Sequence, residues 1–209
     1  MLNCSAFMDG EKGQQVLTAV LLTAVILTVS SSSYFWGRNM LDKSRDQRNF
    51  EEMENLMRNI NKNIMGVSSR GGRRDMSIDL PDDAELRINE AEEGGMDNIT
   101  LNFVVEGQMM ATDQEIAIKG SKGSEAPITQ DSDVIVANSE ESNGNYLVEF
   151  KIYYKNVTVD GEPSSRIDID ATGRLSAISE STDLIINQGP TEQIGDGDFS
   201  VNKVEVRIV

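Results

Sequence analysis

The chain has 209 residues and a formal net charge of −16, and this charge is distributed unevenly. Residues 1–74 contain 10 Lys and Arg against 7 Asp and Glu, whereas residues 75–209 contain 9 against 28. So acidic a region lacks the clustered positive surface that binds phosphates, and we expect no nucleic-acid partner. There is no histidine, and the single cysteine is Cys4. Ser–His and Cys–His nucleophiles are therefore excluded and the usual zinc ligands are missing, so we expect no enzyme, catalytic residue, cofactor or metal site.

The first predicted element is an apolar helix. Residues 16–29 read VLTAVLLTAVILTV, without a charge. With the four serines and the aromatic trio Tyr34, Phe35 and Trp36 that follow, a helix at 1.5 Å per residue spans roughly 31 Å, which matches a bilayer core. Apolar residues surround this helix on all sides, which favours a transmembrane helix over residues 14–36 rather than a buried core helix. Aromatic rings favour the membrane interface, so the trio predicts the outer boundary.

A cleaved secretory signal is an alternative interpretation of the same segment. Its apolar core has a suitable length, and Ser31-x-Ser33 would offer small residues for cleavage before Tyr34. The region ahead of the core fits less well, because Asp9 and Glu11 outweigh Lys12. This alternative predicts a secreted β domain.

The sequence Lys12-Gly13-Gln14, directly ahead of the apolar segment, resembles the class III signal peptides of prokaryotic, especially archaeal, type IV pilins and pilin-like proteins. The resemblance implies that a prepilin peptidase removes residues 1–13 as a leader by cutting between Gly13 and Gln14. It further implies that the apolar helix is retained in a single-pass membrane subunit with an extracellular C-terminal domain. The helices of many copies would then leave the lipid and form the core of a surface filament.

The orientation of the span is open to a second interpretation. Lys12 precedes the span, whereas Arg38, Lys43, Arg45 and Arg48 follow it. The positive-inside rule applied to these residues would place the C-terminal domain in the cytoplasm. A membrane-anchored binding module that never polymerises is a further alternative.

The second half of the helix is predicted to be amphipathic, over residues 37–66. Its apolar residues recur in steps of three and four, at Phe50, Met53, Leu56, Met57, Ile60, Ile64 and Val67. Gly66 is the predicted C-terminal cap. Residues 67–75, which include three arginines and two further glycines, are predicted to be a linker.

Residues 76–209 are predicted to form an acidic antiparallel β-sandwich, so that the fold class is α+β. Apolar residues alternate with polar ones in short runs, at residues 76–80, 86–88, 99–103, 116–118, 134–136, 146–154, 157–159, 167–169, 184–186 and 199–208. Turn residues separate the runs at 81–83, 93–97, 143–145, 160–161, 189–190 and 195–197. The apolar parity changes within the last run, which predicts a bulge near Asn202–Lys203.

Two sequons and two acidic pairs complete the candidate sites. Asn98-Ile-Thr and Asn156-Val-Thr could be N-glycosylated if they lie on an extracytoplasmic surface. Asp131-Ser-Asp133 and Asp196-Gly-Asp198 could offer oxygen ligands to calcium. Neither pair continues into a calcium-loop pattern, and we interpret both as solvated turns.

Overall fold

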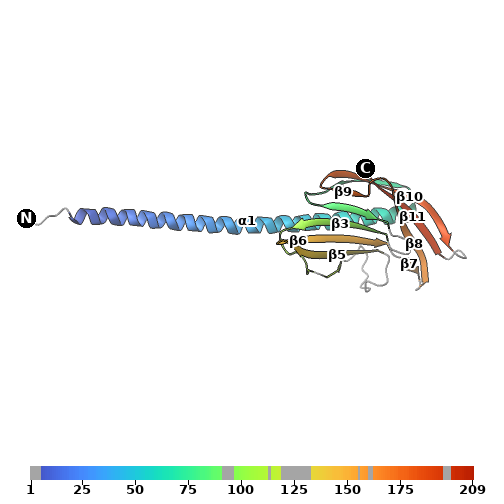
Figure 1. Ribbon diagram of the computed structural model, residues 1–209, viewed down its shortest axis with the longest axis horizontal. Helices are drawn as coiled ribbons and strands as arrows, with labels where there is room; N and C mark the ends of the chain where they lie inside the picture. The colour runs from blue at the N-terminus through green and yellow to red at the C-terminus, as the bar shows by residue number, and fades with distance from the viewer. Residues whose placement is uncertain are drawn as a thin grey trace, which may run out of the picture. The chain divides into compact units, whose positions relative to one another are not determined.

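A computed structural model describes residues 6–90, 97–112, 114–118, 133–154, 156–159, 162–194 and 199–209. The described chain contains a helix, α1 (Ala6–Arg70), followed only by strands. The strands are β1 (Arg73–Asp79), β2 (Glu85–Asn89), β3 (Asn98–Val105), β4 (Ile116–Ile118), β5 (Asp133–Ser142), β6 (Asn145–Tyr154), β7 (Asn156–Val159), β8 (Glu162–Ala171), β9 (Ser176–Ile178), β10 (Ser181–Ile194) and β11 (Phe199–Ile208). The predicted α+β class is confirmed (Figure 1).

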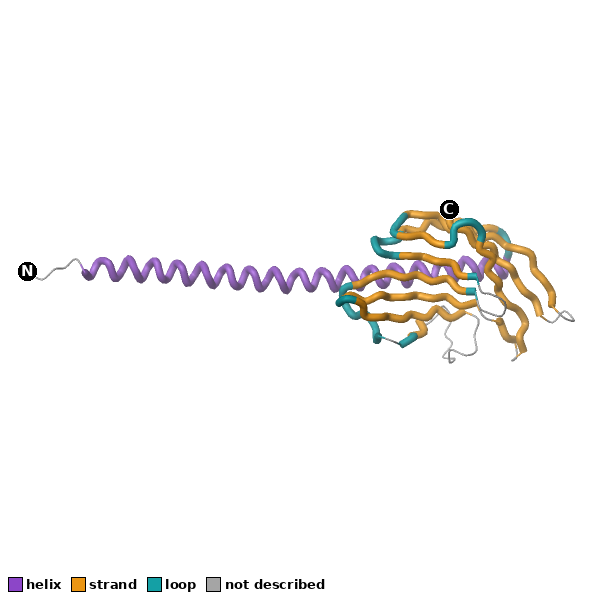
Figure 2. The backbone as a smooth tube through the Cα atoms, viewed as in Figure 1, coloured by secondary structure: helices purple, strands orange, loops and turns teal. Residues whose placement is uncertain are grey.

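The chain divides into two compact units, residues 1–45 and residues 46–209. The first consists of the N-terminal part of α1, and the second combines the rest of α1 with the strands. In the second unit, the strands form a five-stranded sheet in the order β1-β10-β11-β8-β7 and a six-stranded sheet in the order β4-β5-β6-β3-β2-β9. Figure 2 shows both sheets beside the C-terminal part of α1.

The amphipathic face of α1 lies in the core of the second unit, as the spacing predicts. Met57, Ile60, Ile64 and Val67 are completely buried, in one cluster with inward-facing residues of both sheets. At the other end of this face, the ring of Phe50 lies 6.3 Å from that of Phe103 and 5.1 Å from that of Phe150, between centroids. The helix is therefore the shared packing surface of the sandwich.

The helix ends later than predicted, at Arg70 rather than at Gly66. Gly71 has a φ of 75° and donates its backbone N–H to the carbonyl of Val67 at 2.8 Å, so it is the residue that caps the helix. Because β1 begins at Arg73, the predicted linker over 67–75 is reduced to Gly71 and Gly72. The burial of Val67 explains the difference, since one more helical turn is needed to bury it.

Among the described strands, all pairings between neighbours are antiparallel except one, since β8 and β11 run parallel. Parallel neighbours require a crossover. Here β9 in the other sheet and β10 in the same sheet separate the two strands along the chain. The parallel pair is thus the exception to the expected antiparallel sandwich.

The predicted strands are all present, whereas β9 was not predicted because only Ala177 of its three residues is buried.

At the β5–β6 hairpin, Asn143 and Gly144 have φ values of 55° and 83°, as a two-residue type I′ turn requires. The turn at 81–83 is also present, with Asp83 at a φ of 66°. The expected turns at 93–96, 160–161 and 195–197 lie outside the described residues.

The expected bulge is present, but the extra residue belongs to the partner strand. Gln188 pairs with Val204 and Thr191 with Asn202, so Gly189 and Pro190 face Lys203 alone. The Gly-Pro pair therefore interrupts the ladder within β10 instead of forming the predicted turn. Proline suits this place because it has no N–H to donate.

Two buried aspartates connect parts of the second unit. Asp97 is 3% exposed, and its Oδ2 accepts the backbone N–H of Ile169 at 2.8 Å, which links the start of β3 to β8. Asp46 is 7% exposed, and its Oδ2 accepts the N–H of Gly107 at 2.8 Å. The second bond fixes α1 to the loop that follows β3.

Candidate membrane-spanning helix and neighbouring surfaces

The apolar segment of α1 is exposed along its whole length. No residue in the most apolar stretch of this segment is buried. Valine, leucine and isoleucine side chains between Val16 and Val29 are 55–64% exposed. Exposed apolar surface of this extent is unfavourable in water. The segment is thus a candidate single membrane span.

Three threonines interrupt the apolar segment at intervals of five residues, a regularity that the sequence analysis missed. The hydroxyls of Thr18, Thr23 and Thr28 donate to the carbonyls of Gln14, Ala19 and Ala24, each at 2.8 Å. A hydroxyl that bonds to its own helix needs no partner from the surroundings. The threonines are therefore compatible with an apolar environment.

The aromatic trio marks the end of the apolar segment. Tyr34, Phe35 and Trp36 are 66–72% exposed, and the Tyr34 and Phe35 rings meet edge to face with centroids 6.1 Å apart. Exposed aromatic rings at this point fit the interface between lipid and water. The first cations, Arg38 and Lys43, follow within two turns.

Within the described residues, the basic part of the first unit is weakly paired. Arg38 lies 3.8 Å from Asp42 across two exposed side chains, a geometry that contributes little stability. Lys43 and Arg45 make no ion pair with any residue the structure describes. These cations remain available to a partner.

The predicted cleavage residues Lys12, Gly13 and Gln14 lie in one continuous stretch of α1. The carbonyl of Gln14 accepts the hydroxyl of Thr18, and the side chains of residues 1–13 lie outside what is described. Cleavage between Gly13 and Gln14 stays a prediction.

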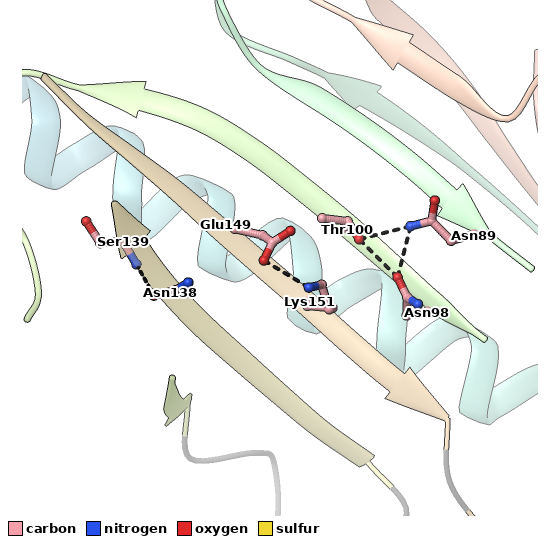
Figure 3. Close-up of polar contacts among 7 residues, drawn as sticks. All are labelled: Asn89, Asn98, Thr100, Asn138, Ser139, Glu149 and Lys151. Carbon is pink, nitrogen blue, oxygen red and sulfur yellow. Dashed lines mark hydrogen bonds and ion pairs between the residues drawn. The ribbon is translucent and has the colours of Figure 1, made fainter. Parts of the chain in front are cut away.

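The sequon at Asn98 is part of a small polar cluster on the outer face of the six-stranded sheet (Figure 3). Asn98 is half-buried, and its Oδ1 accepts Nδ2 of Asn89 at 2.9 Å and the hydroxyl of Thr100 at 3.1 Å. A glycan on Asn98 would have to form beside these bonds. Asn156 is the first residue of β7, and its side chain lies outside the described residues.

An ion pair lies beside this cluster on the same face (Figure 3). Lys151 Nζ lies 2.9 Å from a carboxylate oxygen of Glu149 and 5.8 Å from the centroid of the Tyr153 ring. Burial lowers the pKa of Lys151, but Glu149, through its hydrogen bond and charge, and Tyr153 together raise it by more, so the net pKa is raised. The lysine is therefore a fixed positive charge at neutral pH.

Of the acidic residues considered as calcium ligands, only Asp133 falls among the described residues, at the start of β5. Asp131, Asp196 and Asp198 lie outside them. In the part of the chain that is described, no three His, Cys, Asp or Glu side chains come together as a metal site would require.

An apolar patch at one end of the same sheet was missed from the sequence. Val104 of β3 pairs with Leu147 of β6, which pairs in turn with Glu140 of β5. Both residues occupy outward positions of their strands although they are apolar. Val104 is 40% exposed and Leu147 is 38% exposed. Apolar residues at the positions of a strand that alternation assigns to solvent are the signal that could have located this patch.

The chain was compared with protein-family models, with curated proteins and with solved structures, and none of the three comparisons gave a match.

Proposed function

We propose that the protein is a structural subunit, major or minor, of a type IV pilus-like surface filament. The observation that supports this best is the exposed apolar segment of α1, whose side chains are unburied on every side. Such a helix can exchange lipid neighbours for identical helices, because it buries the same apolar surface in either setting. The internally bonded threonines suit both environments.

The proposed maturation begins with the membrane-inserted chain. A prepilin peptidase hydrolyses the peptide bond between Gly13 and Gln14, which releases the leader and leaves an amino group on Gln14. Membrane lipid surrounds the span until the helix associates with other subunits. The acidic β domain stays on the extracellular side, where its charge keeps it soluble.

Mass spectrometry of the mature N-terminus, in membrane and sheared surface fractions, tests this proposal. We expect a chain that starts at Gln14, either free or cyclised with loss of ammonia, and we expect filaments in the sheared fraction. A terminus at Tyr34 would indicate a secreted domain instead, and an intact Met1 would indicate an ordinary anchor.

Protease treatment of whole cells gives the orientation. Digestion of the β domain from outside agrees with the proposal. Protection of the domain in intact cells, with digestion after lysis, would support the cytoplasmic orientation that Arg38, Lys43 and Arg45 favour under the positive-inside rule.

A further inference from the structure

The segment between the aromatic trio and the second unit presents a mixed basic and apolar face. Arg38, Leu41 and Arg45 follow one another at steps of three and four, so they share one side of α1. Leu41 is 72% exposed, so its side chain is available for contact with another surface. We call these three residues the basic face. Lys43 is on nearly the opposite side of the helix, because two residues rotate it by about 200°.

A surface of matching character exists in the second unit. The outward pair Val104 and Leu147 has Glu140 beside it on β5, and Glu106 follows one residue after β3 ends. Both glutamates are exposed and make no ion pair with any residue within the described ranges. We call Val104, Leu147, Glu106 and Glu140 the acidic patch. It offers apolar contact to a leucine and carboxylates to two arginines.

We propose that the basic face of one copy of this chain docks on the acidic patch of a second copy. The charges are complementary, since two arginines flank a leucine on one side and two glutamates flank a valine and a leucine on the other. Within the second unit, the bond from Gly107 to Asp46 fixes the loop that carries Glu106.

Anionic lipid is the competing partner, and distance along the helix argues against it. Arg45 lies nine residues beyond Trp36, or roughly 13 Å along the axis, which exceeds a Debye length of about 8 Å at physiological salt. Headgroups at the aromatic boundary would account for Arg38 but not for Arg45. A lipid surface would also act on Lys43 as strongly as on Arg45.

The test rests on the proposed function and compares two charge reversals two residues apart. Arg45→Glu places a carboxylate on the basic face, and Lys43→Glu makes the same change on the other side of the helix. The readout is the ratio of sheared surface filament to membrane-bound subunit. Reversal turns attraction into repulsion, so we expect Arg45→Glu to lower this ratio about fivefold and Lys43→Glu to leave it near wild type. Either Glu106→Lys or Glu140→Lys, each combined with Arg45→Glu, should restore the ratio, according to which glutamate Arg45 meets.

The outcomes separate the inference from the proposed function. If the wild-type chain forms no filaments, both are overturned. If wild-type filaments form and the two reversals have equal effects, or neither double variant is rescued, only the docking inference is overturned. If both charge reversals abolish binding to anionic vesicles while the filament yield stays unchanged, the basic residues bind lipid and the docking inference is overturned. Equal resistance of the β domain to limited proteolysis in all variants excludes misfolding as the cause.

Discussion

At the residue scale, two glycines in the second unit show that the same residue type is required in one place and dispensable in another. A Cβ on Gly189 would lie 2.9 Å from Cβ of Lys203 and 3.0 Å from its carbonyl oxygen, so the two strands approach too closely for any other residue. Gly66 has nothing within 4 Å of its Cβ position and lies inside α1. The bulge therefore explains one glycine, while helix geometry does not require the other.

Alanine at these two positions should change stability in opposite directions. Gly189→Ala must shift backbone at the bulge, and we expect a loss of about 1–3 kcal/mol in the free energy of unfolding. Gly66→Ala should gain about 0.5–1 kcal/mol, because alanine loses less backbone entropy in a helix. Denaturant unfolding of the detergent-solubilised protein, followed by far-ultraviolet circular dichroism, measures both. A loss at Gly66 would contradict the assignment of that residue to the helix interior.

At the element scale, the amphipathic part of α1 acts as the central packing element of the sandwich. Ile60 is completely buried in the cluster that joins both sheets, whereas its neighbour Asn59 is exposed. The apolar face is thus committed to the core of its own domain. The exposed apolar surface of the first unit has no such partner within the described residues.

Substitution of these neighbours should separate packing from helix propensity. Ile60→Ala removes buried methyl groups and leaves a cavity, so we expect a loss of about 2–5 kcal/mol. Asn59→Ala should change the free energy of unfolding by less than about 0.5 kcal/mol. Thermal unfolding of both variants beside wild type checks this. Similar losses for the two substitutions would mean that α1 does not pack on the sheets as described.

At the scale of the whole molecule, the division near residue 45 predicts that the acidic part folds independently. The second unit contains the described core, and its inward residues are covered by its own helix and sheets. Ser44 and Gln47 have the spacing of a capping box, which suits a new helix start at this point.

A fragment of residues 44–209 should therefore be soluble without detergent. We expect a monomer with a cooperative unfolding transition, because the exposed apolar segment is removed and the strong negative charge opposes association. Size-exclusion chromatography with light scattering, together with thermal unfolding, tests the expectation. Aggregation, or a non-cooperative transition, would show that residues 1–43 are needed for folding.

The sequence by itself determined the features that depend on local patterns. The apolar helix, the amphipathic face from Phe50 to Val67, the turn at Asn143-Gly144 and the positions of the described strands other than β9 follow from residue periodicity and turn chemistry. These patterns are readable because each residue type reports on its own backbone and its own exposure. The candidate membrane span is local for the same reason.

Only the tertiary structure decided what depends on residues far apart in the chain. The helix continues past Gly66 because the burial of Val67 outweighs the helix-breaking tendency of glycine. The parallel pairing of β8 with β11, the bond from Ile169 to Asp97 and the bond from Gly107 to Asp46 each join distant segments. The patch around Val104 and Leu147 exists because strand pairing places two outward apolar residues side by side. Alternation within one strand can mark an outward apolar residue such as Val104, but which strands become neighbours is set by the packing of the whole domain.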